Sequence, residues 1–140
     1  MKTMFIDEKE LVQAINIKNY EEAFTNWLCK KITFSCYEYT TSVDKDGYVR
    51  GSADLLFEST DKTIAVIIEA KNKKATMHVV PQVLRYLNDL RKKYNECYAC
   101  ILAPSISWDL EEYLLYTTDN VIATVFHEDG TVSGYGQKGN

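Results

Sequence analysis

The sequence predicts one domain of the α/β class, in which helices flank a mixed sheet. Apolar residues recur with the period of a helix in four segments, and they form the alternating or continuous runs typical of strands in five others. The chain has 140 residues, of which 46% are hydrophobic, so it is long enough to bury a core without disulfides. The expected order is helices, three strands, helix, strand, helix, strand.

Two helices are expected at the start of the chain. Residues 7–17 predict a short helix, because Leu11, Val12 and Ile15 fall at helical spacings. A second helix is expected from a cap at Asn19 to about Ile32. Its apolar residues share one side and are Tyr20, Ala23, Phe24, Trp27 and Leu28.

Three strands follow, over residues 33–43, 50–58 and 63–71, with polar turns at 44–47 and 59–62 between them. The run from Ile64 to Ile68 is continuously apolar, as in a central strand that is covered on both faces. Because the connections are short, we expect these three strands to form a meander.

The second half of the chain alternates helices and strands. A helix is expected over residues 80–94, with Pro81 in its first turn, and the elements after it are a strand at 97–103, a helix at 108–116 and a strand at 121–126. We therefore predict a single domain over residues 1–126. Residues 127–140 contain four glycines and are expected to form a flexible tail.

The bulk properties argue against several classes of protein. No run approaches the about 18 apolar residues that a membrane span needs, and the chain becomes acidic at Asp7 before a signal-peptide segment can form. We expect an intracellular, cytoplasmic protein that does not contact a membrane. The net charge of −4 gives no global electrostatic reason to expect strong non-specific binding of nucleic acid by this chain alone.

Four cysteines occur, at positions 29, 36, 97 and 100. Cys97 and Cys100 form a CxxC pattern, but they fall in an apolar, strand-like run. Residues three apart on a strand point to opposite faces, which is wrong for a shared metal. Buried free thiols are therefore expected; an iron–sulfur site that uses all four cysteines is the alternative.

Charged side chains gather at the ends of two predicted strands. Glu69 and Lys71 follow the apolar run of the third strand and, being two apart, face the same way. Asp54 lies 15 residues before Glu69, on the preceding strand. If the two strands are antiparallel neighbours, both carboxylates and the amine converge. Carboxylates can hold Mg²⁺ while leaving it waters and a phosphate oxygen, and a nearby lysine can orient or help to deprotonate the attacking water.

A purely structural alternative exists for these residues. Burying charge at the end of a central strand is unfavourable unless it is compensated, so Glu69 and Lys71 could form a buried ion pair while Asp54 satisfies a turn. The combination of three residues at strand positions, followed by a helix with Gln82 and Tyr86, favours a site for phosphodiester cleavage.

Three segments together resemble the PD-(D/E)XK nuclease superfamily. The likeness extends over about residues 21–103 and is closest to the RecB-like branch and to the nuclease domain of type I restriction enzyme R subunits. The segments are Gly51-Ser-Ala-Asp54-Leu-Leu-Phe57, Ala65-Val-Ile-Ile-Glu69-Ala-Lys71 and Gln82-Val-Leu-Arg-Tyr86.

The resemblance implies a restriction-endonuclease-like α-β-β-β-α-β core. It also implies that Asp54 and Glu69 bind Mg²⁺ or Mn²⁺, with the Ala70 carbonyl as a further ligand, and that Lys71 is the catalytic lysine. Two departures are evident: Ala53 stands where the family has proline, and the chain has no motor region, so an R-subunit role does not transfer.

The family often has a metal-binding glutamate on its first helix, and Glu21 and Glu22 compete for this role. At about 100° per residue, Glu21 borders the apolar side of its predicted helix, whereas Glu22 points to water. Glu21 is therefore the expected further metal ligand, and Glu8 is a weaker candidate. Each could also be a solvated acid at a helix start.

Gln82 and Tyr86 are four apart and share a helix face; they match the QxxxY element of the RecB-like branch and are predicted to contact nucleic acid. Arg85, Lys73 and Lys74 are expected to contact phosphates, and Arg91, Lys92 and Lys93 are further basic candidates. For each, a surface or core-edge role is the alternative. His78 is expected to be a bystander beside the site.

These observations predict a metal-dependent nuclease that hydrolyses DNA, either as a homodimer or with a larger protein partner. A non-catalytic binding module with the nuclease fold is the alternative. The presence of Asp54, Glu69 and Lys71 together favours catalysis, because a non-catalytic module has no need for all three. RNA cleavage is a third possibility, since recognition of the ribose is local.

Overall fold

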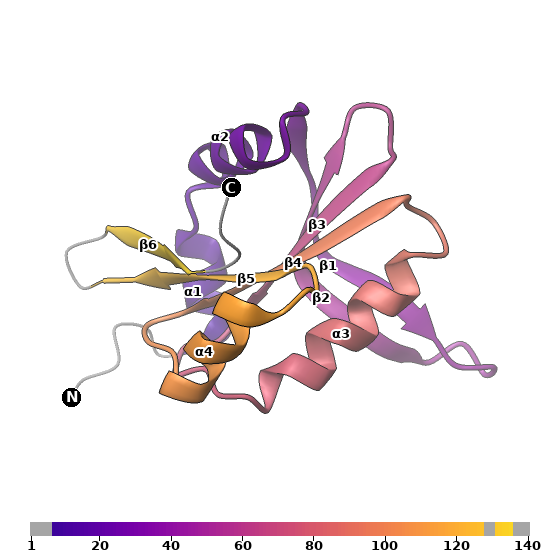
Figure 1. Ribbon diagram of the computed structural model, residues 1–140. Helices are drawn as coiled ribbons and strands as arrows, with labels where there is room; N and C mark the ends of the chain where they lie inside the picture. The colour runs from indigo at the N-terminus through magenta and orange to yellow at the C-terminus, as the bar shows by residue number, and fades with distance from the viewer. Residues whose placement is uncertain (1–6, 128–130, 136–140) are drawn as a thin grey trace.

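A six-stranded mixed sheet forms the centre of the computed structural model, which describes residues 7–127 and 131–135 (Figure 1). The strands lie side by side in chain order, β1 to β6. The first three pair antiparallel, as the predicted meander requires; β3, β4 and β5 are parallel, and β6 is antiparallel to β5. The elements are α1 (Glu8–Ala14), α2 (Ile17–Leu28), β1 (Ile32–Val43), β2 (Val49–Ser59), β3 (Ile64–Ala70), α3 (Val79–Leu90), β4 (Glu96–Ala103), α4 (Trp108–Tyr116), β5 (Val121–Phe126) and β6 (Val132–Tyr135).

Helices cover both faces of the sheet, so the molecule has two cores. The core on one face contains residues of α1 and α2 with Leu55 and Phe57 of β2, and the core on the other contains residues of α3 and α4 with Leu56. Every residue of β3 is buried, which confirms the predicted central strand. The restriction-endonuclease-like α-β-β-β-α-β order is therefore present, with β3 at its centre.

Three helices have boundaries that differ from the prediction. Helix α2 begins at Ile17 because the Asn16 side chain accepts a hydrogen bond from the backbone N–H of Asn19, so Asn16 is the cap and Asn19 lies in the first turn. It ends at Leu28, where Cys29 takes a left-handed conformation. Helix α1 ends at Ala14, and α3 ends at Leu90, with a turn leading into β4.

Strand β6 lies within residues 127–140, the segment expected to be a tail, and no strand was predicted there. It pairs with β5 from Ala123 to Phe126. Two of its four residues, Val132 and Tyr135, are strand formers, but the segment is only four residues long and contains Gly134, so it lacks a strand pattern.

The cysteines are free thiols. Cys97 and Cys100 are buried in the cores on opposite faces of the sheet, which is the placement that their spacing on a strand predicts. None of the helices in the described part of the chain is long and apolar enough to cross a membrane.

Candidate active site

Asp54 and Glu69 lie on neighbouring antiparallel strands. The pairing of β2 with β3 ends at Leu55 opposite Ile68, so the next step along both strands places Asp54 opposite Glu69. The backbone N–H of Ala70 donates to Asp54 Oδ2 at 2.7 Å, which fixes the carboxylate against the end of β3. The predicted convergence of the two acids is therefore present.

The alternation of β2 is interrupted at Asp54. Ala53 and Leu56 are three apart, yet both lie in the core under α3 and α4, while Leu55 lies in the opposite core. Such irregularities re-aim side chains and are frequent beside active sites. Here Asp54 lies half-buried in the middle of β2, next to the point where the pairing with β3 ends at Leu55, and its carboxylate turns toward β3.

Lys71 and Gln82 complete a hydrogen-bonded cluster on the α3 side of the sheet. Lys71 Nζ lies 3.4 Å from Glu69 Oε2 and donates to Gln82 Oε1 at 3.3 Å. Gln82 Nε2 donates to Glu69 Oε2 at 3.3 Å and to the hydroxyl of Tyr86 at 2.7 Å. Gln82 and Tyr86 thus face the same site, as their spacing predicts.

The electrostatics of the cluster disfavour two bare carboxylates. Burial raises the pKa of Glu69 to about 7; the neighbouring Asp54 adds to the rise and Lys71 opposes it. Burial also raises the pKa of Asp54, while the Ala70 N–H and Lys71 lower it. Ionising both carboxyl groups is therefore unfavourable in this cluster, and a bound cation would stabilise their charged forms.

The pKa of Glu69 predicts a pH-dependent stability. Glu69 holds its proton more tightly in the folded state, so its contribution to the free energy of unfolding is largest below about pH 4.5 and falls as the pH rises to about 7. The loss is on the order of 3 kcal/mol.

Denaturant titrations of metal-free wild type and Glu69→Gln from pH 4 to 8 test this prediction. The difference between their free energies of unfolding should grow with pH. The exposed control Glu22→Gln should show none; parallel curves for wild type and Glu69→Gln would contradict the prediction.

The residues present fit a hard divalent cation. Glu69 Oε1 is buried and has no hydrogen-bond partner. The N–H and C=O of one strand residue point to the same neighbouring strand, so the Ala70 carbonyl also faces the Asp54 side. Among residues 7–127 and 131–135, no three His, Cys, Asp or Glu side chains are grouped to hold a metal by themselves. Asp54 and Glu69 supply two carboxylates, and Mg²⁺ is usually bound by one or two carboxylates with waters and substrate phosphate.

Glu21 is not part of this cluster, so its prediction as a metal ligand was wrong. Its carboxylate accepts from the backbone N–H of Phe34 in the edge strand β1 at 2.7 Å. It lines a different hollow, together with Glu22 and Thr25. Glu21 borders the buried face of α2, as expected, but that face meets the sheet away from Asp54.

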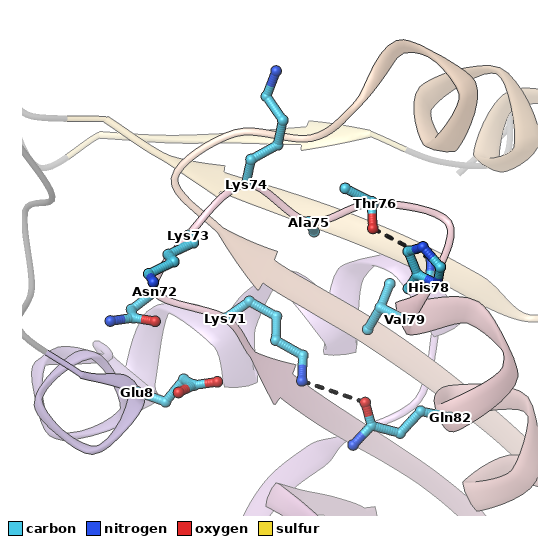
Figure 2. A pocket seen from close by; sticks show the side chains of 10 residues that line it. All are labelled: Glu8, Lys71, Asn72, Lys73, Lys74, Ala75, Thr76, His78, Val79 and Gln82. Carbon is cyan, nitrogen blue, oxygen red and sulfur yellow. Dashed lines mark hydrogen bonds between the residues drawn. The ribbon is translucent and has the colours of Figure 1, made fainter. Parts of the chain in front are cut away.

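Glu8, the weaker candidate, is the helix acid that lies near the site. Its charge raises the pKa of both Asp54 and Glu69. It lines a pocket of about 270 Å³ together with Lys71 and Gln82, and Figure 2 shows it on the α1 side of that pocket. The signal in the sequence is Asp7, which accepts from the N–H of Glu10, caps α1 and so fixes Glu8 in the first turn.

The predicted basic contacts surround the same pocket. Lys73 and Lys74 line it on the loop between β3 and α3, as does His78; the amine of Lys74 extends outward in Figure 2. Two backbone hydrogen bonds hold this loop against β4 and the segment that follows it. Lys71 N donates to Leu102 O, and Ala75 N donates to Ser105 O.

The remaining predicted contacts lie along α3 and beyond its end. Arg85 is exposed beside the ring of Tyr86, with 6.0 Å between its guanidinium carbon and the ring centre. Arg91, Lys92 and Lys93 are exposed after α3, and Lys93 donates to the hydroxyl of Tyr39. Tyr86 itself is only 3% exposed, so it offers almost no surface to a nucleic acid.

Comparison with known proteins gives one family and two solved structures. A family model described as "Endonuclease NucS C-terminal domain" matches residues 28–125. The crystal structure of a repair endonuclease from Pyrococcus abyssi is similar, with a TM-score of 0.53 and 20% identity, over 79% of this chain and 45% of that chain. The structure of an EndoMS–dsDNA2 complex has a TM-score of 0.44 and 22% identity, over 72% of this chain and 41% of that chain. No curated protein matches the sequence. The chain thus spans less than half the length of both solved relatives.

Proposed function

The chain belongs to the endonuclease NucS C-terminal domain family, and from that premise we propose that it is a metal-dependent nuclease that hydrolyses DNA phosphodiester bonds. The observation that best supports this proposal is the meeting of Asp54, on β2, with Glu69 and Lys71, at the end of the neighbouring strand β3, with one buried Glu69 oxygen left without a partner. The family name supports nuclease activity, and DNA as substrate is part of the proposal.

Each residue has a separate role in the proposed reaction. Asp54, Glu69 and the Ala70 carbonyl would hold Mg²⁺ or Mn²⁺, which lowers the pKa of a bound water and neutralises charge on the phosphate. Lys71 would orient that water and stabilise negative charge on the phosphate oxygens. Gln82, hydrogen-bonded to both Lys71 and Glu69, holds the two groups apart at a fixed distance. Lys73, Lys74 and Arg85 would contact phosphates along the strand.

The relation to the RecB-like branch, the protein partner and the location inside the cell are further parts of the proposal. The likeness to the RecB-like branch rests on Gln82 and Tyr86. Since the chain spans less than half of each solved relative, and its net charge is −4, we propose that a second copy or a larger partner protein supplies further contacts to DNA inside the cell.

Glu8 and Glu21 give a matched pair of variants. Glu8→Gln should raise the Mn²⁺ concentration required for half-maximal cleavage by about tenfold, because it removes a negative charge that acts on both metal-binding acids. Glu21→Gln should leave it unchanged. Cleavage rates measured against Mn²⁺ concentration test this. Equal effects of the two variants would mean that the charge of Glu8 does not contribute to metal binding at this site.

The proposed function is tested with the wild-type chain on two substrates. Incubation with Mn²⁺ or Mg²⁺ should nick supercoiled plasmid or degrade single-stranded DNA, EDTA should stop the reaction, and Mn²⁺ should raise the melting temperature. A chain that is inert on DNA and RNA, and whose melting temperature does not respond to Mn²⁺, would instead be the non-catalytic binding module.

A further inference from the structure

Tyr86 fits against β2 because residue 51 is glycine. An ideal Cβ built on Gly51 would lie 3.1 Å from Cε1 and 3.3 Å from Cδ1 of Tyr86, and 2.5 Å from Oγ1 of Thr41. Real Cβ atoms do not approach another heavy atom as closely as 2.5 Å, so any side chain here would displace its neighbours. A Cβ would therefore clash with the Thr41 hydroxyl and would also push the Tyr86 ring away from β2 by a few tenths of an ångström.

The hydroxyl of Tyr86 is hydrogen-bonded to the side chain of Gln82, so the position of the ring affects the position of the Gln82 amide. The hydroxyl accepts from Gln82 Nε2 at 2.7 Å, the shortest of the three hydrogen bonds made by the Gln82 amide. The same amide group accepts from Lys71 and donates to Glu69, both at 3.3 Å. Moving the Tyr86 ring would therefore shift the one group that contacts both the proposed catalytic lysine and a proposed metal ligand.

The chemistry of the amide explains why this contact matters. An amide has one acceptor and one donor end, and here the acceptor faces an ammonium and the donor faces a carboxylate. The charges fix which end faces which group, but they do not fix how far the amide sits from each. The buried Tyr86 hydroxyl, on the same face of α3 as Gln82, is a third hydrogen-bond partner, and it fixes the distance of the amide from the other two groups.

We propose that Gly51 and Tyr86 are positioning residues, which hold the Gln82 amide at the distance that aligns Lys71 with Glu69. Tyr86 then acts through Gln82 and does not contact the nucleic acid, and Gly51 acts through Tyr86. The catalytic part of this inference rests on the proposed nuclease function; the positioning of Gln82 does not.

Kinetics on a DNA substrate separate positioning from binding. Tyr86→Phe keeps the ring and removes the hydroxyl, so kcat should fall about five- to tenfold with KM unchanged. Gly51→Ala should lower kcat at least as much. Gly134→Ala is the matched control, because a Cβ there meets nothing within 4 Å, and its kcat should equal that of wild type.

The double variant Gly51→Ala/Tyr86→Phe tests whether the two residues act in series. If Gly51 acts through the Tyr86 hydroxyl, the double variant should lose no more kcat than the worse single variant. Losses that multiply, or a kcat for Tyr86→Phe within twofold of wild type, would overturn the proposal.

A readout without catalysis distinguishes this inference from the proposed function. In ¹⁵N NMR spectra of the metal-free protein, the side-chain amide resonances of Gln82 should shift in Tyr86→Phe and Gly51→Ala and stay in place in Gly134→Ala. Unchanged Gln82 resonances in Tyr86→Phe, which keeps the packing of the ring, would overturn the positioning role. If wild type cleaves no DNA, the nuclease proposal fails, while these spectra still decide how Gln82 is held.

Discussion

Replacing Lys71 by alanine should lower metal-dependent DNA cleavage by about 10²- to 10³-fold and cost little stability. The amine lies at the edge of the site, with 29% of the side chain exposed, and is 3.4 Å from Glu69 Oε2. Glu69 keeps the hydrogen bond from Gln82 when Lys71 is absent. Because the pKa of Glu69 is raised to about 7, part of its charge is also removed by protonation near neutral pH. The assays are plasmid nicking and thermal melting.

This variant separates the nuclease from a purely structural ion pair. If Lys71 only neutralised Glu69, its loss would strand a buried carboxylate and cost several kcal/mol. Lys45→Ala, at an exposed lysine in the turn before β2, is the control for a general loss of positive charge and should cleave DNA as wild type does. A Lys71→Ala protein that cleaves DNA normally, or that is destabilised by several kcal/mol, would favour the structural role.

Asp54→Asn should abolish both cleavage and the Mn²⁺-induced rise in melting temperature. An amide is a poor ligand for a hard cation in place of a carboxylate, so the variant should lose the roughly 3 kcal/mol that a bound metal gives at about 100 times its Kd. The metal-free variant should be as stable as wild type or more so. Its carbonyl oxygen can still accept from Ala70 N–H, and the charge that raises the pKa of Glu69 is gone.

Melting curves with and without Mn²⁺ provide the measurement for Asp54. Asp46→Asn, in the exposed turn before β2, should behave as wild type in both conditions. An Asp54→Asn protein that keeps the Mn²⁺ response would remove Asp54 from the metal site.

The core of the site could be predicted because strand geometry is local. Residues two apart on β3 must share a face, so Glu69 and Lys71 were paired by the sequence itself. The short turn at 59–62 made β2 and β3 antiparallel neighbours, which brought Asp54 opposite Glu69. Gln82 followed from its place in the first turn of α3. A charged cluster at the end of the most buried strand is a strong signal because burial demands compensation.

The third acid could not be predicted, because helical periodicity gives only the rotation of a helix about its own axis. It showed that Glu21 borders the buried face of α2, but not where α2 lies along the sheet. The edge strand β1 has outward N–H groups with no neighbouring strand, and Glu21 accepts from one of them at Phe34. Glu8 reaches the site instead because α1 contacts β3.

Tyr86 shows a different limit of sequence patterns. Its spacing from Gln82 correctly placed both on one face of α3, but spacing cannot distinguish a residue that touches substrate from one that supports the residue that does. The Tyr86 ring is buried and packs closely against Gly51, a long-range contact that the spacing of residues along α3 does not reveal.

Diffraction from crystals soaked in Mn²⁺ tests the central claim most directly, because the metal can be located by its anomalous signal without any substrate. We predict one strong peak between Asp54 and Glu69, with carboxylate oxygens of both residues at about 2.1–2.3 Å, and no such peak in crystals of Asp54→Asn. A crystal that takes up no Mn²⁺ at this position, or that binds it only away from Asp54 and Glu69, would contradict the assignment of this cluster as the site of a metal-dependent nuclease.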